Sequence, residues 1–182
     1  MKLYITGAPG SGKTSAASSI ARQYGIRVHC LDDVIWDNSE GTKNRRVPEA
    51  IRDRNLLAIA SRPMWIVEGT YGAPWVRPIL ERADCVIILN TPPMLRLLRL
   101  MKRHFVDRSP FRAAVDNIRL FVSNARWGST YEAGPLPQLI QLLHATGTPF
   151  HVHAKGDLLA LVAWVRRNTR YSGSDVWVAD RT

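Results

Sequence analysis

The segment GAPGSGKT, residues 7–14, constrains this chain more than any other stretch of it. It follows the short apolar run KLYIT, residues 2–6, and it leads into an Ala- and Ser-rich segment. Its spacing satisfies the pattern G-x-x-x-x-G-K-[ST] in the setting of a strand followed by a helix. Such a loop leaves backbone N–H groups unpaired, and unpaired donors in a concave loop attract an anion. The segment therefore predicts a loop that binds phosphate, above all the phosphates of a nucleotide.

Each residue type in this loop has its own part in holding phosphates. Glycines let the backbone approach the ligand and adopt positive φ. Lys13 is expected to reach the β- and γ-phosphates and the Thr14 hydroxyl to hold Mg²⁺, while the following helix adds its positive N-terminal dipole. An ordinary tight turn is the alternative, and spacing and context favour the phosphate loop. The residues expected to hold the nucleotide are Gly7, Ala8, Pro9, Gly10, Ser11, Gly12, Lys13, Thr14 and Ser15.

Apolar runs of strand length alternate with helical segments along the chain. The runs are continuous rather than alternating in polarity, which is typical of strands covered on both faces. Strands separated by helices imply parallel crossovers, so we expect an α/β sandwich with helices on both sides and ligands at the carboxyl ends of the strands. The expected strands cover residues 2–6, 27–31, 64–68, 84–90 and 149–154, and the expected helices cover residues 14–24, 48–61, 94–105 and 158–165.

Length and charge limit the class of protein. A chain of 182 residues favours one domain, which we place at residues 1–170, with a helical cover at residues 92–130 and a loosely ordered tail at residues 171–182. The formal net charge of +10 favours anionic partners such as phosphorylated small molecules or nucleic acid. A solvated basic surface without a specific partner is the alternative reading of the same charge.

Cysteine, histidine and hydropathy patterns favour a soluble cytoplasmic protein. Cys30 and Cys85 each lie in an apolar run, which suits small buried residues better than a disulfide. The five histidines show no metal-ligand spacing, so we expect no transition metal. No window approaches 18 apolar residues, and the N-terminus lacks the pattern of a signal peptide, so we expect no membrane segment.

Carboxylates follow two of the expected strands, where the sheet would aim them at the loop. Asp32 and Asp33 come after the second strand, and they can accept a substrate hydroxyl or hold a metal. Glu68 ends the third strand and can bind the water shell of the metal. The alternatives are that Asp33 caps the next helix and that Glu68 is a solvent-facing strand end. The aromatic residues expected to line an acceptor pocket are Trp36, Tyr71 and Trp75.

The helix expected at residues 94–105 has an apolar side and a cationic side. Met94 and Leu97 belong to the apolar side, while Arg96, Arg99 and Arg103 lie opposite at i, i+3 and i+7. Arginines that close over a migrating phosphoryl group stabilise its charge, and a cover excludes water. A solvated amphipathic helix and a nucleic-acid contact are the alternatives.

The order of these motifs resembles a known family. MKLYITGAPGSGKT, LDDVIW, WIVEGTY and ERADCVIIL, with prolines and the LRLMKR helix after them, are similar to the DNA topology modulation proteins, small phosphate-loop proteins of the adenylate-kinase-like superfamily. The likeness spans residues 1–168 and is least specific at residues 109–147. It implies a P-loop fold like that of nucleoside monophosphate kinases, with a five-stranded parallel sheet in the order 2-3-1-4-5, and ATP and Mg²⁺ as ligands.

By position, the resemblance gives roles to Lys13, Thr14, Asp32, Arg99 and Arg103. Glu68 and Asn90 stand where that group usually has aspartate. The stretch EGTYGAPW occupies the place of the DGFPR-like segment of true adenylate kinases, which disfavours AMP as the acceptor.

Together these patterns predict an ATP-dependent kinase for a small hydroxyl- or phosphate-bearing acceptor. Lys13 and the loop hold the phosphates, Thr14 and Glu68 hold Mg²⁺, Asp32 orients or deprotonates the acceptor, and Arg99 and Arg103 stabilise the migrating charge. The alternative is a nucleotide-dependent protein that binds nucleic acid or modulates DNA topology without kinase activity. The residues expected to contact the acceptor are Asp32, Asp33, Trp36, Glu68 and Tyr71.

Overall fold

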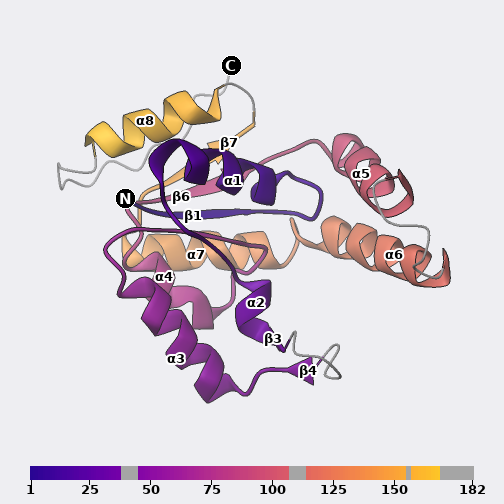
Figure 1. Ribbon diagram of the computed structural model, residues 1–182, viewed down its shortest axis with the longest axis horizontal. Helices are drawn as coiled ribbons and strands as arrows, with labels where there is room; N and C mark the ends of the chain where they lie inside the picture. Colours follow the sequence, from indigo (N-terminus) through magenta and orange to yellow (C-terminus); the bar gives the residue numbers. More distant parts are fainter. Residues whose placement is uncertain (38–44, 107–113, 155–156, 169–182) are drawn as a thin grey trace.

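A computed structural model describes residues 1–37, 45–106, 114–154 and 157–168 (Figure 1). The tail expected at residues 171–182 and part of the expected cover lie outside these residues. No helix of the described part is long and apolar enough to cross a membrane.

A five-stranded parallel sheet forms the centre of the fold. Each strand comes from one of the expected apolar runs, and the sheet order is β2-β5-β1-β6-β7. Counted among these strands alone, the order is 2-3-1-4-5, so the expected fold class and topology are confirmed. The strands are β1 (Lys2–Gly7), β2 (Val28–Cys30), β5 (Trp65–Gly69), β6 (Cys85–Leu89) and β7 (Phe150–His153).

Helices cover both faces of the sheet and make it the middle of three layers (Figure 1). In β1, Leu3 and Ile5 pack into one buried cluster with α1 and α8, while Tyr4 packs into the other with α3, α4 and α7. This alternation places two cores on opposite sides of one strand. The helices of the two outer layers are α1 (Lys13–Tyr24), α3 (Glu49–Ala60), α4 (Arg77–Leu80), α7 (Pro135–Thr146) and α8 (Leu158–Asn168).

The elements beside the carboxyl ends of the strands are shorter or project from the sheet. Helix α5 continues into a turn of π-helix, and α5 and α6 extend beyond the sheet on the right of Figure 1. A two-stranded antiparallel pair, β3 with β4, was not expected from the sequence. These elements are α2 (Asp32–Ile35), β3 (Trp36–Asp37), β4 (Arg45–Arg46), α5 (Pro93–Met101), the π-turn η2 (Lys102–Val106), α6 (Ala114–Thr130) and the 3₁₀ turn η1 (Pro74–Val76).

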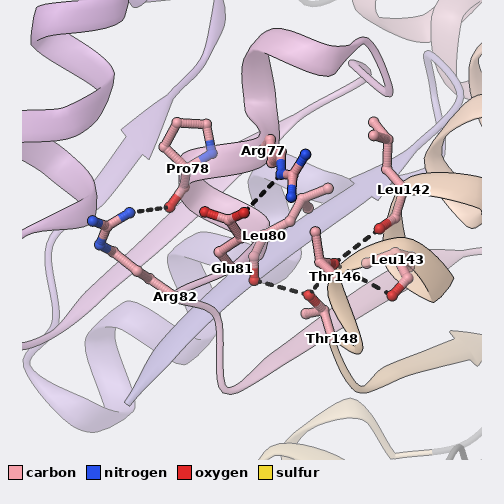
Figure 2. Close-up of polar contacts among 9 residues, drawn as sticks. All are labelled: Arg77, Pro78, Leu80, Glu81, Arg82, Leu142, Leu143, Thr146 and Thr148. Carbon is pink, nitrogen blue, oxygen red and sulfur yellow. Dashed lines mark hydrogen bonds and ion pairs between the residues drawn. The ribbon is translucent and has the colours of Figure 1, made fainter.

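A buried hydroxyl fixes α4 to the segment that enters β7. The Thr148 Oγ1 donates to the Leu80 carbonyl at 3.1 Å and lies 2.6 Å from the Thr146 hydroxyl (Figure 2). Thr148 is buried, so its hydroxyl depends on these partners and not on water. The bond therefore ties two elements that are distant in sequence.

Thr148→Val keeps the side-chain shape and removes this bond. We expect it to lower the free energy of unfolding by about 1–3 kcal/mol, because a buried hydrogen bond to the Leu80 carbonyl and the contact with the Thr146 hydroxyl are lost. Urea unfolding measures the change. Ser61→Ala, which removes an exposed hydroxyl, should stay within about 0.5 kcal/mol. An equal loss for the two variants would contradict the assigned role of Thr148.

Candidate phosphate loop and acceptor cavity

The glycine-rich loop connects β1 to α1 at the carboxyl edge of the sheet. Gly10 and Gly12 have φ of 80° and 96°, a region that glycine enters at little cost. Gly12 is the N-cap residue of α1, and no side chain caps that helix end. The first N–H groups of a helix have no acceptor within it, so this end offers main-chain donors and a positive dipole to a ligand.

Lys13 folds back into the loop. Its Nζ donates to the Ala8 carbonyl at 3.1 Å. Burial lowers the pKa of Lys13 to about 8, although the nearby carboxylates of Glu68 and Asp32 favour its charged form. A buried cation is stabilised by a negative partner, so the loop is suited to an anionic ligand.

Thr14 and Glu68 form a pair of oxygen groups beneath the loop. The Thr14 Oγ1 donates to Glu68 Oε1 at 3.1 Å. Glu68 is only 5% exposed, so the alternative of a solvent-facing strand end is wrong. Cys30 pairs with Glu68 across β2 and β5, and burial together with that carboxylate raises the pKa of the Cys30 thiol to about 12. The thiol is therefore neutral.

This pair fits Mg²⁺, which takes oxygen ligands and is commonly held by one or two protein groups together with substrate phosphates. Within the described residues, no group of three or more His, Cys, Asp and Glu side chains gathers to hold a metal by itself. A metal at Thr14 and Glu68 would therefore take its remaining ligands from water or from a bound molecule.

Asp32 is fixed by a tyrosine from the neighbouring strand connection. The Tyr71 hydroxyl donates to Asp32 Oδ1 at 2.6 Å. The Tyr71 carbonyl accepts a hydrogen bond from the Tyr4 hydroxyl at 2.7 Å. The Tyr71 ring packs against the Trp75 ring, with 5.3 Å between the ring centroids. Trp75 packs against the same buried cluster as Tyr71, and unlike Tyr71 it is not among the described residues that line the cavity beside Asp32.

Asp33 differs from its neighbour. Both residues open α2, whose N-cap residue is Leu31, so the alternative that Asp33 caps this helix is wrong. Asp33 is exposed and is not among the described residues that line the cavity beside Asp32. Only the first of the two aspartates thus faces the space next to the loop.

A cavity of about 840 Å³ lies between the loop and α6. Pro9 of the loop, Asp32, Trp36 and Tyr71 form one side of it. The structure thus brings three of the expected acceptor residues together beside the phosphate loop, while Glu68 lies on the Thr14 side. Sequence reasoning missed several other cavity residues, which are Arg46, Arg119, Arg126 and Trp127.

Helix α5 presents its arginine side to the loop. Arg96 is 7% exposed and pairs with Glu132 at 2.7 Å, and Arg99 donates to the Ser11 carbonyl at 3.1 Å. Arg103 follows in the π-turn η2 and is exposed, and its positive charge contributes to lowering the pKa of Lys13. For Arg96 and Arg99, the alternative of a cationic side that only faces solvent is wrong.

The apolar side of α5 faces outward instead. Met94 is 69% exposed and Leu98 is 55% exposed. The helix contacts the loop with its backbone too, because a Cβ on Gly10 would lie 2.6 Å from the Arg96 carbonyl oxygen. The expected amphipathic pattern is therefore present. An ordinary surface helix buries its apolar side, whereas α5 exposes its apolar side and packs its arginine side against the protein.

The fold and this edge of the sheet define an α/β protein with a five-stranded parallel sheet and a glycine-rich loop. No model of a known protein family matches the chain, and no curated protein matches it either.

A glycine-to-alanine pair tests the close contact between the loop and α5. Gly10 and Gly25 both have positive φ, and only Gly10 has a backbone oxygen in the way of a Cβ. Each alanine should cost about 1–2 kcal/mol of stability for its conformation. Gly10→Ala should cost about 1–3 kcal/mol more, because α5 must shift. Chemical denaturation measures both, and equal costs would contradict the contact.

The Lys13 ammonium should titrate near pH 8. NMR of ¹³Cε-labelled lysine follows it, with Lys13→Ala identifying the signal. Glu68→Gln should lower this pKa further, because the Glu68 carboxylate stabilises the charged form. Glu81→Gln on α4 is the matched control and should leave it unchanged. Titration near the ordinary value of about 10.4 would mean that Lys13 is hydrated and does not occupy the loop.

Proposed function

We propose that this protein is an ATP-dependent phosphotransferase that transfers the γ-phosphate to a small hydroxyl- or phosphate-bearing acceptor. The observation that carries the proposal is the uncapped start of α1, with Lys13 folded into the glycine-rich loop and the Thr14–Glu68 pair beside it. Main-chain donors, a buried cation and two oxygen ligands are the groups that a nucleotide triphosphate needs. The described parts of residues 92–130 then serve as the cover of a single domain at residues 1–170.

On the nucleotide side, the loop N–H groups and Lys13 bind the phosphates. Thr14 and Glu68 would hold Mg²⁺, which would supply positive charge to neutralise the phosphate oxygens. Arg99 on α5 donates to the same loop and Arg103 follows in η2, and their charge stabilises the γ-phosphoryl group as it moves. Preorganised charges of this kind act strongly because the surrounding groups do not need to rearrange.

On the acceptor side, Asp32 is the proposed base. Its carboxylate accepts a hydrogen bond from the acceptor hydroxyl and takes the proton as the acceptor oxygen bonds to the γ-phosphorus and ADP leaves. The bond from Tyr71 fixes the position of the carboxylate, and the cavity beside it leaves room for the acceptor. A phosphate-bearing acceptor already carries an anionic oxygen and needs no proton transfer.

The alternative of nucleic-acid binding receives less support from α5. That reading needs Arg96, Arg99 and Arg103 as a free cationic stripe for backbone phosphates. Arg96 is buried against Glu132, and Arg99 is engaged with loop carbonyls. These contacts favour a role toward a ligand of the loop.

The proposal predicts ATP turnover that depends on Lys13 and Asp32. ADP release is measured with Mg²⁺ and a panel of nucleosides, nucleotides, sugars and hydroxy acids. Lys13→Ala should lower kcat/KM at least about 100-fold, because it removes a donor to the transferred phosphate. Asp32→Asn should also lower it at least about 100-fold for a hydroxyl acceptor, because the base is lost.

Arg54→Ala and Asp53→Asn remove one positive and one negative charge at exposed positions on α3, away from the loop and the cavity, and should leave turnover intact. Calorimetry with ATP and ADP accompanies the assay. Absence of nucleotide binding would refute the loop assignment. Binding without any acceptor that raises ADP release above the rate with water would refute the transfer.

A further inference from the structure

The wall of the cavity formed by α6 carries three large apolar side chains that are open to water, among polar and cationic ones. Ile118, Val122 and Trp127 line the cavity and are 51%, 44% and 43% exposed. Open apolar surface costs about 25 cal/mol for each Å² that stays in contact with water. A ligand with an apolar body that covers these side chains would recover that cost.

The opposite wall is aromatic. Trp36 and Tyr71 line it, and the Arg46 guanidinium lies 5.3 Å from the centre of the Trp36 ring. Aromatic rings on one side and Trp127 on the other favour a flat body between them. The shape and surface of the cavity therefore favour a ring system over a chain of hydroxyl groups.

The charge of the cavity points to an anion. Arg46, Arg119 and Arg126 line it together with one carboxylate, that of Asp32. Asp32 is engaged with Tyr71, and no carboxylate among the described residues pairs with Arg119 or Arg126. A ligand that displaces water from these guanidinium groups must replace the lost hydration with acceptor oxygens. Phosphate and carboxylate groups match the guanidinium fork in charge and geometry.

We propose that the acceptor is a flat, mainly apolar organic anion, whose phosphate or carboxylate binds Arg119 and Arg126 on α6. Its ring lies between α6 and the wall formed by Trp36 and Tyr71, which leaves a hydroxyl or second phosphate for Asp32 and the loop. Naming this molecule the acceptor rests on the proposed function. Its binding to the cavity does not, because that step requires neither ATP nor transfer.

Binding of small aromatic probes tests the inference without turnover. The probes are phenyl phosphate, phenylacetate, neutral benzyl alcohol and cationic benzylamine, with inorganic phosphate for comparison, and ligand-detected NMR measures affinity. We expect at least one of the two aromatic anions to bind at least about tenfold more tightly than benzyl alcohol, which corresponds to one charge-assisted pair. Inorganic phosphate should bind the cavity more weakly than phenyl phosphate, because it lacks the apolar body.

Variants separate the cavity from the loop. All affinities are measured in a Lys13→Ala background, which weakens binding of a phosphate to the loop. Arg119→Ala with Arg126→Ala should lower anion affinity at least about tenfold. Arg54→Ala with Arg62→Ala removes the same charge at exposed positions away from the cavity and should change affinity less than about twofold.

Trp127→Ala tests the apolar wall. It should weaken the binding of phenyl phosphate and leave the binding of inorganic phosphate unchanged. Circular dichroism shows that each variant is folded.

Several outcomes would overturn the inference. They are equal affinity for benzyl alcohol and the anions, anion binding unchanged when Arg119 and Arg126 are replaced, and anion binding that is lost with Lys13→Ala alone. A short single-stranded oligonucleotide that outcompetes phenyl phosphate at the same arginines would replace the small molecule with nucleic acid. Probe binding as expected, with no ATP turnover for any acceptor, would support this cavity and refute the kinase.

Discussion

The contact between the glycine-rich loop and α5 is the constraint on which the rest of the site depends. The Ser11 carbonyl accepts hydrogen bonds from Thr91 at 3.0 Å and from Arg99 at 3.1 Å. In a planar trans peptide the carbonyl and the next N–H point in opposite directions. Holding the Ser11 carbonyl therefore also orients the Gly12 N–H away from α5. Side chains thus fix the Ser11 and Ala8 carbonyls of the loop, while the Ser11 N–H is held by the Ala8 carbonyl and the Gly12 N–H is turned away from α5.

This contact also explains why α5 turns its cationic side toward the protein and its apolar side toward water. A buried guanidinium is costly unless it is paired, and Arg96 meets that need through Glu132. The absence of a side chain on Gly10 lets the Arg96 backbone approach the loop closely. Positive charge is thereby collected around the loop, where Lys13 is already buried, at the expense of leaving Met94 and Leu98 in water. Such an arrangement is understandable if an anion completes the site.

The sequence predicted the parallel sheet and the loop because both depend on local patterns. Continuous apolar runs specify strands buried on two faces, and residues 7–14 specify the turn between a strand and a helix. Which side of α5 faces the protein was not predictable. An amphipathic pattern defines an apolar side and a cationic side, but it does not say which neighbouring element packs against each. The pairing of β3 with β4 involves two residues in each strand, too few for a periodic signal. Arg119 and Arg126 enter the cavity through tertiary placement of α6, which no local pattern in residues 109–147 specifies.

The ion pair between Arg96 and Glu132 joins more than two side chains. Arg96 belongs to the helix that grips the loop, and Glu132 follows directly after α6, the helix that walls the cavity. Beside it, the Tyr131 hydroxyl lies 3.3 Å from the Thr6 hydroxyl on β1. The ion pair therefore connects the helix that contacts the loop with the helix that lines the cavity. A change at either helix is therefore transmitted to the other through a charged pair that is buried on the Arg96 side.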